Sequence, residues 1–210
     1  QLLQAAVSAF SQGQQARATQ LALQTLQLLP EQPDALHLLA LCARHQNNTE
    51  LALQYFKRSL QAGPSQSAVW SNYGNLLQQL DQLEGAEQAY QQALRLAPHQ
   101  ADSWLNAGLL ALRQQQPQLA QDRLQKAVQL RPEDPRAYAP LASSLAQLEQ
   151  VGAALQLLEQ ALLRWPGQTQ LLWQKAQLLR EKQQPAAAAD IIRQLLAASP
   201  EQAELYFMAG

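Results

Sequence analysis

The sequence predicts an all-α fold, a stack of repeated helix pairs, and three observations support it. Prolines recur with a 34-residue period: Pro30, Pro64, Pro98, Pro132, Pro166 and Pro200. Alanines recur with the same period: Ala18, Ala52, Ala86, Ala120, Ala154 and Ala188. Between them, apolar residues follow the i, i+3/i+4, i+7 spacing of helices. A period of this length indicates a repeat protein, in which each repeat contacts only its neighbours.

The repeat divides the chain into six units and the start of a seventh. With the recurring proline at position 32, we expect one array over 1–210, with repeats 1–32, 33–66, 67–100, 101–134, 135–168 and 169–202 and a partial repeat 203–210. The third repeat shows the pattern best, because a short break at Asp81 and Gln82 separates two helical segments. Each repeat is therefore predicted to contain two helices.

Prolines mark the predicted helix boundaries. The recurring proline closes the second helix of each repeat, because proline cannot continue a helix. Four other prolines are expected at first helical positions, where the missing N–H costs no hydrogen bond: Pro33, Pro117, Pro135 and Pro185. Pro140 fits neither role. It lies either in the first turn of a helix that begins near Ala137, or at a kink that exposes a carbonyl to ligand.

Small and large residues alternate at fixed positions of the repeat. Position 20 is the alanine ladder. Position 8 is always small: Ala6, Ala40, Gly74, Gly108, Ala142, Ala176 and Gly210. Position 4 is mostly a large side chain: Leu2, Leu36, Trp70, Trp104, Tyr138, Leu172 and Tyr206. The small residues let the two helices approach closely, and the large ones are predicted to fill the space between repeats.

Composition excludes several classes of function. The 210 residues carry a net charge of −1, from 15 basic and 16 acidic residues. This balance argues against nucleic-acid binding and against a polybasic membrane patch. No apolar run approaches the ~18 residues of a membrane span. The 39 glutamines alternate with Leu and Ala at helical spacing, which predicts neutral surface positions. The single cysteine, Cys42, lies among apolar residues and is predicted to be buried.

The sequence predicts neither an enzyme nor a cofactor site. His37 and His45 lie more than one helical turn apart without cysteine or carboxylate ligands at suitable spacing, so they make a poor metal site. The glycines do not cluster into a phosphate-binding loop, and no serine or cysteine lies in a nucleophile motif. We therefore expect no catalysis, no metal and no cofactor.

The two ends of the chain suggest a piece of a longer protein. The sequence begins with Gln1 rather than Met, and ends at Gly210 within a repeat. The sequence weakly favours a cytoplasmic location, with a periplasmic location as the alternative. Apolar side chains at both ends predict end-to-end self-association at high concentration: Leu2, Leu3, Val7, Phe10, Leu205, Tyr206, Phe207 and Met208.

The pattern resembles the tetratricopeptide repeat (TPR) family along the whole chain. The third repeat matches the family pattern at Trp70, Gly74, Ala86, Tyr90, Ala93 and Pro98, and the fourth at Trp104, Gly108, Ala120, Ala127 and Pro132. The resemblance implies a right-handed superhelical solenoid of six helix pairs and part of a seventh. It also implies a concave groove, lined by the first helices, that binds extended peptides or partner helices.

Two groove patterns of TPR subfamilies can be compared with this chain. The groove is partly similar to the asparagine ladder of O-GlcNAc-transferase-like arrays, in which position 6 holds a peptide backbone. Asn72 and Asn106 fit this ladder, with Asn75 alongside, and Asn can both donate and accept. Leu38, Pro140 and Gln174 take this position in other repeats. The carboxylate clamp of chaperone-binding TPR proteins fits less well. Arg136 could serve as one of its cations, but Ser71 and Pro140 replace the other two.

The remaining groove candidates are apolar or basic. Leu105, Leu109 and Leu112 form an apolar stripe, and Trp173 is either a packing residue or a docking anchor. The resulting predicted site is Asn72, Asn75, Asn106, Leu105, Leu109, Arg113, Arg136, Trp173 and Gln174. The expected function is a protein-interaction scaffold that binds protein or peptide. The alternatives are a targeting or oligomerisation arm of a larger enzyme (glycosyltransferase, oxygenase or sulfotransferase), or a bacterial envelope assembly factor.

Overall fold

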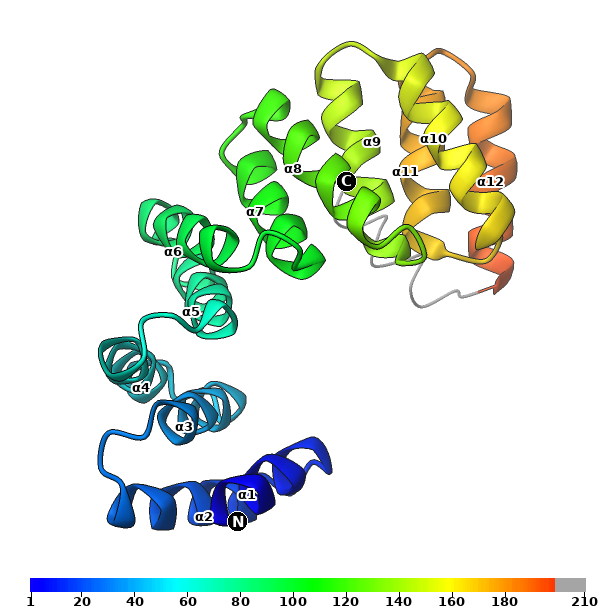
Figure 1. Cartoon of the computed structure of the whole chain (residues 1–210). Coiled ribbons are helices and arrows are strands. Elements are labelled where there is room, and N and C mark those ends of the chain that lie inside the picture. Colours follow the sequence, from blue (N-terminus) through cyan, green and yellow to red (C-terminus); the bar gives the residue numbers. More distant parts are fainter. Residues whose placement is uncertain (199–210) are drawn as a thin grey trace. The chain divides into compact units, whose positions relative to one another are not determined.

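The structure, a computed structural model, describes residues 1–198, and all regular elements in that range are helices (Figure 1). The helices are α1 (Leu2–Ser11), α2 (Gln15–Leu28), α3 (Pro33–His45), α4 (Thr49–Ala62), α5 (Ser67–Gln79), α6 (Leu83–Leu96), α7 (Ala101–Arg113), α8 (Pro117–Leu130), the 3-10 turn η1 (Pro135–Ala137), α9 (Tyr138–Gln147), α10 (Val151–Arg164), α11 (Thr169–Glu181) and α12 (Pro185–Ala198). The predicted all-α fold of helix pairs is confirmed. Pro200 and the partial repeat 203–210, with the apolar residues predicted to associate there, lie outside the described residues.

The chain comprises two compact parts. The N-terminal part, residues 1–98, contains α1–α6, and the C-terminal part, from residue 99, contains α7–α12. In each part the two helices of a repeat pack on each other, as α3 does on α4 and α7 on α8. The second helix also packs on the first helix of the next repeat, as α2 does on α3 and α8 on α9 (Figure 1). Each pair thus buries its apolar surface against its neighbour, as expected of a TPR-like stack.

In the turn within each repeat, the residue at one fixed position has a left-handed backbone conformation. Positive φ angles recur with the 34-residue period: Gly13, Asn47, Asp81, Gln115, Glu149 and Gln183. The next amide closes the helix end, as Gln82 N–H does by donating to the Leu77 carbonyl at 2.9 Å. The Asp81 amide donates to the Gln78 carbonyl at 3.2 Å. These two bonds form a Schellman motif. The sequence gives little sign of it, because only Gly13 is a glycine.

The alanine ladder lies in the buried interior of the stack. Each of its six members is buried, and so is Cys42, as predicted. Position 8 is small for the same reason. A Cβ added to Gly108 would lie 2.6 Å from Leu124 Cγ, and one added to Gly74 would lie 2.8 Å from Tyr90 Cε1. In repeats 3 and 4 the residue at position 24 thus occupies the space that a Cβ at position 8 would need.

The large residue at position 4 is tied to the recurring proline. The Trp70 indole Nε1 donates to the Pro64 carbonyl at 2.8 Å, and the Tyr138 hydroxyl donates to the Pro132 carbonyl at 2.8 Å. Proline still offers a carbonyl although it lacks an N–H. The recurring proline therefore both ends a helix and anchors the aromatic side chain that follows it.

The helix starts agree with the predicted roles of the prolines. Pro33, Pro117 and Pro185 are the first residues of α3, α8 and α12, whereas Pro135 begins the 3-10 turn η1. Pro140 is the third residue of α9, so it lies in the first turn, where an N–H needs no partner within the helix. The first-turn alternative is confirmed for Pro140. The 3-10 turn accommodates this second proline by delaying the start of the α-helix to Tyr138.

Candidate peptide-binding face

A hollow of about 660 Å³ lies between the first helices of repeats 1 and 2. Apolar and polar side chains both line it. The lining residues are Leu3, Gln4, Val7, Ser8, Phe10, Ser11, Asp34, His37, Leu38 and Leu41. The resemblance to TPR arrays places positions 2, 5, 6, 9, 12 and 13 of each repeat on the groove, and all the lining residues except Ser8 occupy such positions. Asp34, His37, Leu38 and Leu41 were therefore expected on the groove of repeat 2, although the predicted site contained none of the ten residues. The helical spacing of Leu3, Val7 and Phe10 on one side of α1 was a further usable signal.

His37 connects this hollow to the next repeat. Its ring packs against Phe56, with the ring centroids 6.0 Å apart. Burial lowers the pKa of His37 to about 4; the carboxylate of Asp34 partly opposes this and Arg44 adds to it. The imidazole is therefore neutral at neutral pH, and its Nε2 can accept a hydrogen bond from Asn72 Nδ2 at 3.1 Å. This bond uses one of the two Nδ2–H donors of Asn72, whose carbonyl oxygen accepts no hydrogen bond within residues 1–198 and remains an acceptor.

Asn75 forms its hydrogen bond through its carbonyl oxygen, whereas Asn72 uses its amide nitrogen. The Tyr90 hydroxyl donates to Asn75 Oδ1 at 2.7 Å or to Gln78 Oε1 at 2.9 Å. Since a hydroxyl has one proton, these two bonds alternate. Burial raises the pKa of Tyr90, so the hydroxyl remains a donor. The Asn75 carbonyl is thus used by the protein, and its amide nitrogen keeps its donors. Asn72 and Asn75 lie three residues apart on α5, a spacing that places both on one side of a helix.

Asp34 and Asp102 occupy the same repeat position but have different partners. Among residues 1–198, Asp34 receives amide hydrogen bonds from Gln66 Nε2 at 2.7 Å and from Gln32 Nε2 at 3.2 Å. Amides carry no charge, so the negative charge of Asp34 is not neutralised by these partners.

Asp102 instead pairs with Arg131 at 2.9 Å and with Arg136 at 2.6 Å. Burial raises the pKa of Asp102, but hydrogen bonds from the two arginines outweigh burial and lower it. Arg136 also pairs with Asp134 at 2.5 Å and lowers the pKa of that carboxyl to about 2. Arg136, predicted as a groove cation, therefore has two carboxylate partners within the protein.

The other predicted site residues of the C-terminal part differ in exposure. Leu105 is 6% exposed and belongs to the core, whereas Leu109 is 36% exposed. Arg113 is exposed, and Asn106, Trp173 and Gln174 are partly exposed. The two residues that replace clamp cations, Ser71 and Pro140, are buried. Of the apolar stripe, Leu109 presents the most surface to solvent.

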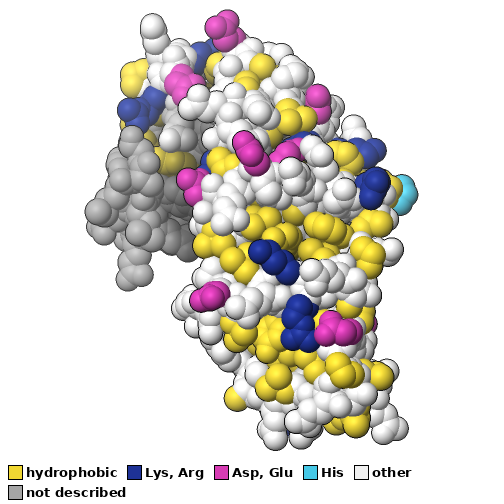
Figure 2. Space-filling model, turned by 90° about the vertical axis from the view of Figure 1, so that its left-hand side faces the viewer, with side chains coloured by type: hydrophobic (Ala, Val, Ile, Leu, Met, Phe, Trp, Pro, Cys, Tyr) yellow, Lys and Arg dark blue, Asp and Glu magenta, His cyan; other side chains and the backbone are white. Residues whose placement is uncertain are grey.

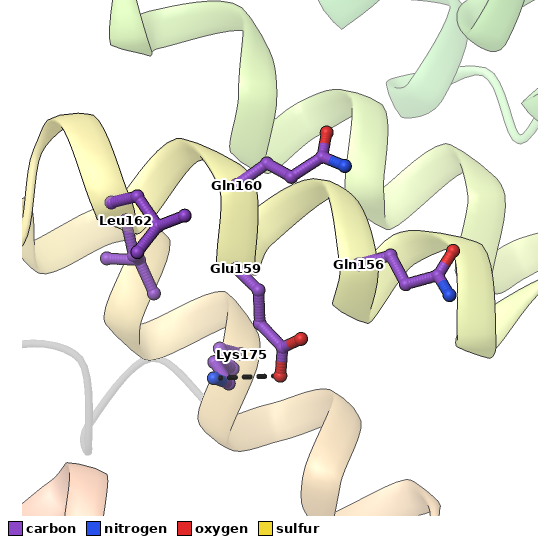
Figure 3. A pocket seen from close by; sticks show the side chains of 6 residues that line it. Gln156, Glu159, Gln160, Leu162 and Lys175 are labelled. Atoms are coloured by element: carbon purple, nitrogen blue, oxygen red, sulfur yellow. Dashed lines mark ion pairs between the residues drawn. The ribbon is translucent and has the colours of Figure 1, made fainter.

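The second helices of the C-terminal part carry two further hollows. One, of about 670 Å³, is lined by Gln156, Glu159, Gln160, Leu162, Leu163 and Lys175 (Figure 3). Glu159 reaches from α10 to Lys175 of α11 at 3.1 Å. The other, of about 390 Å³ between α8 and α10, shares Gln156 and Gln160 with the first. The glutamines thus lie at the surface, as predicted. On the face in Figure 2, charged side chains are scattered among uncharged ones rather than gathered in a patch.

Residues 1–198 include no helix that is both long and apolar enough to cross a bilayer. That range also has no cluster of three or more His, Cys, Asp or Glu side chains that could hold a metal ion.

Family profiles identify the chain. One tetratricopeptide repeat profile matches residues 3–67, 105–169 and 139–203, and a second matches residues 65–133. The chain belongs to the tetratricopeptide repeat family. No curated protein sequence matches this TPR protein.

Solved structures show the same TPR fold at low sequence identity. The structure of pilF from Pseudomonas aeruginosa is 21% identical, with a TM-score of 0.83 over 99% of this chain and 95% of that one. PilW, described as a type IV pilus biogenesis factor, is 22% identical, with a TM-score of 0.83 over 95% and 92% of the two chains. YrrB, described as a TPR protein with an unusual peptide-binding site, is 20% identical, with a TM-score of 0.72 over 90% and 96%.

Proposed function

We propose that this TPR protein is a non-catalytic interaction scaffold that holds an extended peptide or a partner helix against its first helices. The observation that carries the proposal is the complementary state of Asn72 and Asn75. Asn72 keeps an acceptor and Asn75 keeps donors, so together they match the N–H and C=O of an extended backbone. Such pairing is independent of the ligand side chains.

The predicted residues of the C-terminal part form a second proposed site on that part. There Asn106 would contact a ligand backbone, and Leu109, Arg113, Trp173 and Gln174 would contact ligand side chains. Leu105 would support Leu109 from the core. Arg136 would position Asp102 and Asp134 rather than bind a carboxylate, because both carboxylates already pair with it.

A bacterial envelope assembly role is a second candidate. It is supported by the likeness to PilW, described as a pilus biogenesis factor, and to pilF. In that role the same face would bind a segment of another assembly protein. The two proposals therefore share one binding surface, and the site can be tested before the partner is known.

The test uses a phage-displayed library of random dodecapeptides and the full chain. Peptides enriched on the wild-type protein are synthesised, and their affinities are measured by fluorescence polarisation. Because an unpaired peptide group costs about 1–3 kcal/mol, the double variant Asn72→Ala, Asn75→Ala should bind at least about tenfold more weakly. Gln125→Ala, on the exposed side of α8, is the matched control. Wild-type affinity in the double variant would refute the asparagine contacts.

A further inference from the structure

The geometry points to a ligand with a large apolar side chain next to a lysine or arginine, the apolar group filling the hollow between α1 and α3 and the cation pairing with Asp34. This inference rests on the proposed function and adds the chemistry of the ligand. It concerns residues 1–98 alone, so it depends only on the N-terminal part.

The hollow has apolar lining residues suited to a large apolar side chain. Val7 is 52% exposed, although apolar side chains surround it in the hollow. Phe10 and Leu41 also line the hollow and are partly exposed. The volume of about 660 Å³ lies within the range of ligand pockets, roughly 300–1,000 Å³. An apolar surface of this kind, lined also by polar groups, marks a docking site.

The hollow also carries a negative charge, the carboxylate of Asp34, that a ligand cation could pair with. Asp34 lines the hollow and is exposed, and its two amide partners leave its negative charge in place. The neighbouring His37 does not neutralise it, because burial keeps that imidazole uncharged. Arg44 lies ten residues further along α3, about 15 Å along the helix axis. A cation supplied by the ligand is the missing counter-charge.

In repeat 4, arginines of the protein itself neutralise the carboxylate at the equivalent position. Asp102 occupies the position of Asp34 and is paired by Arg131 and Arg136. Gly63 and Ala68 take the places relative to Asp34 that Arg131 and Arg136 have relative to Asp102, so no arginine stands at either position to pair with Asp34. The difference leaves a charged carboxylate beside an apolar hollow. An acidic peptide would be repelled there, and a neutral peptide would leave the carboxylate unpaired.

The experiment compares selections from the same dodecapeptide library on three proteins. The wild type should enrich peptides in which Lys or Arg lies within two residues of Trp, Phe or Leu. Asp34→Asn should keep the apolar preference and lose the basic one. Val7→Gln should lose the apolar preference. Glu50→Gln, an exposed acid at the start of α4 away from the hollow, is the control and should select as the wild type does.

Affinity measurements then separate the two proposals. A synthetic peptide from the wild-type selection should bind Asp34→Asn roughly two- to fivefold more weakly, the effect of one partly exposed ion pair. High salt should weaken wild-type binding but leave Asp34→Asn nearly unchanged. If enriched peptides lack basic residues yet depend on Asn72 and Asn75, the inference fails and the scaffold stands. If no peptide is enriched, both fail. If Val7→Gln converts a self-associating wild type to a monomer, a second copy occupies the hollow and the inference fails.

Discussion

At the scale of single residues, close approach decides which side chains the stack tolerates. Gly108 lies in the middle of α7, where alanine would ordinarily be more stable than glycine by about 0.5–1 kcal/mol. Here a Cβ would lie 2.6 Å from Leu124 Cγ, and Leu124 is fully buried and cannot move aside. We expect Gly108→Ala to destabilise the protein by about 1–3 kcal/mol, the usual cost of overpacking.

A matched glycine supplies the control. Gly152 is the second residue of α10, and a Cβ there would meet no atom within 4 Å. Gly152→Ala should therefore stabilise the protein slightly, by at most about 0.5–1 kcal/mol, the mid-helix value. Urea unfolding of the two variants gives the comparison. Equal effects of the same sign would show that helix propensity, rather than the contact with Leu124, governs both positions.

The buried histidine makes stability depend on pH. The pKa of His37 falls from 6.5 to about 4 on folding, so the folded state holds fewer protons than the unfolded state at intermediate pH. Stability is complete above pH 6.5 and is lost as pH falls toward the folded pKa, by roughly 2–3 kcal/mol at pH 4.5. His37→Gln keeps an acceptor for Asn72 but does not titrate, so it should remove this part of the loss. A variant that loses as much stability as the wild type between pH 7 and pH 4.5 would contradict this role of His37.

Individual contacts were the part of the site least accessible from sequence. Residue type and repeat position indicated Asn72, Asn75 and Arg136 as groove residues. The hydrogen bond from Tyr90 to Asn75 crosses 15 positions, and the pair between Arg136 and Asp102 crosses 34. Such partners depend on side-chain geometry between helices, which a one-dimensional pattern does not contain. The sequence thus predicted where polar side chains lie, but not which of their atoms the protein already uses.

At the scale of elements, the turn within each repeat stores a small backbone cost. Gln115 and Glu149 adopt φ angles of 56° and 62°, which L-residues other than Asn and Asp rarely take. Glycine has no Cβ penalty there, so Gln115→Gly and Glu149→Gly should each stabilise the protein by about 0.5–1 kcal/mol. Gln114, the preceding residue, has a φ of −83°, and Gln114→Gly should destabilise instead. Thermal unfolding of these single variants would show whether φ decides the sign.

Helix boundaries were predictable where covalent structure fixes them. Proline at Pro33, Pro117 and Pro185 marks a helix start because its ring fixes φ and removes a donor. The 3-10 turn before α9 was not foreseen, since it results from two prolines, Pro135 and Pro140, in one segment. The Schellman turns were missed for a different reason: hydrogen bonds of the helix end impose the left-handed residue whatever its side chain.

At the scale of the whole molecule, the surface is nearly neutral and rich in glutamine. With a net charge of −1, long-range repulsion between copies is weak. Contacts between copies are then governed by exposed apolar groups. Leu28 and Leu29, at the end of α2, are 72% and 59% exposed, and with Leu2 and Leu3 they line a further hollow of the N-terminal part. This surface has the same apolar character as those buried between adjacent repeats.

We therefore expect self-association at high concentration through this surface. The double variant Leu28→Gln, Leu29→Gln should raise the dissociation constant of the self-complex about tenfold or more. Burying one leucine side chain contributes roughly 1.5–3 kcal/mol of binding free energy. Leu163→Gln is the control, since Leu163 is 84% exposed but lies in the C-terminal part. Apolar association should persist at high salt, unlike the peptide contact with Asp34. Sedimentation equilibrium over a range of concentrations measures both effects. A wild type that stays monomeric at the highest concentration, or a double variant that associates as strongly as the wild type, would exclude this surface.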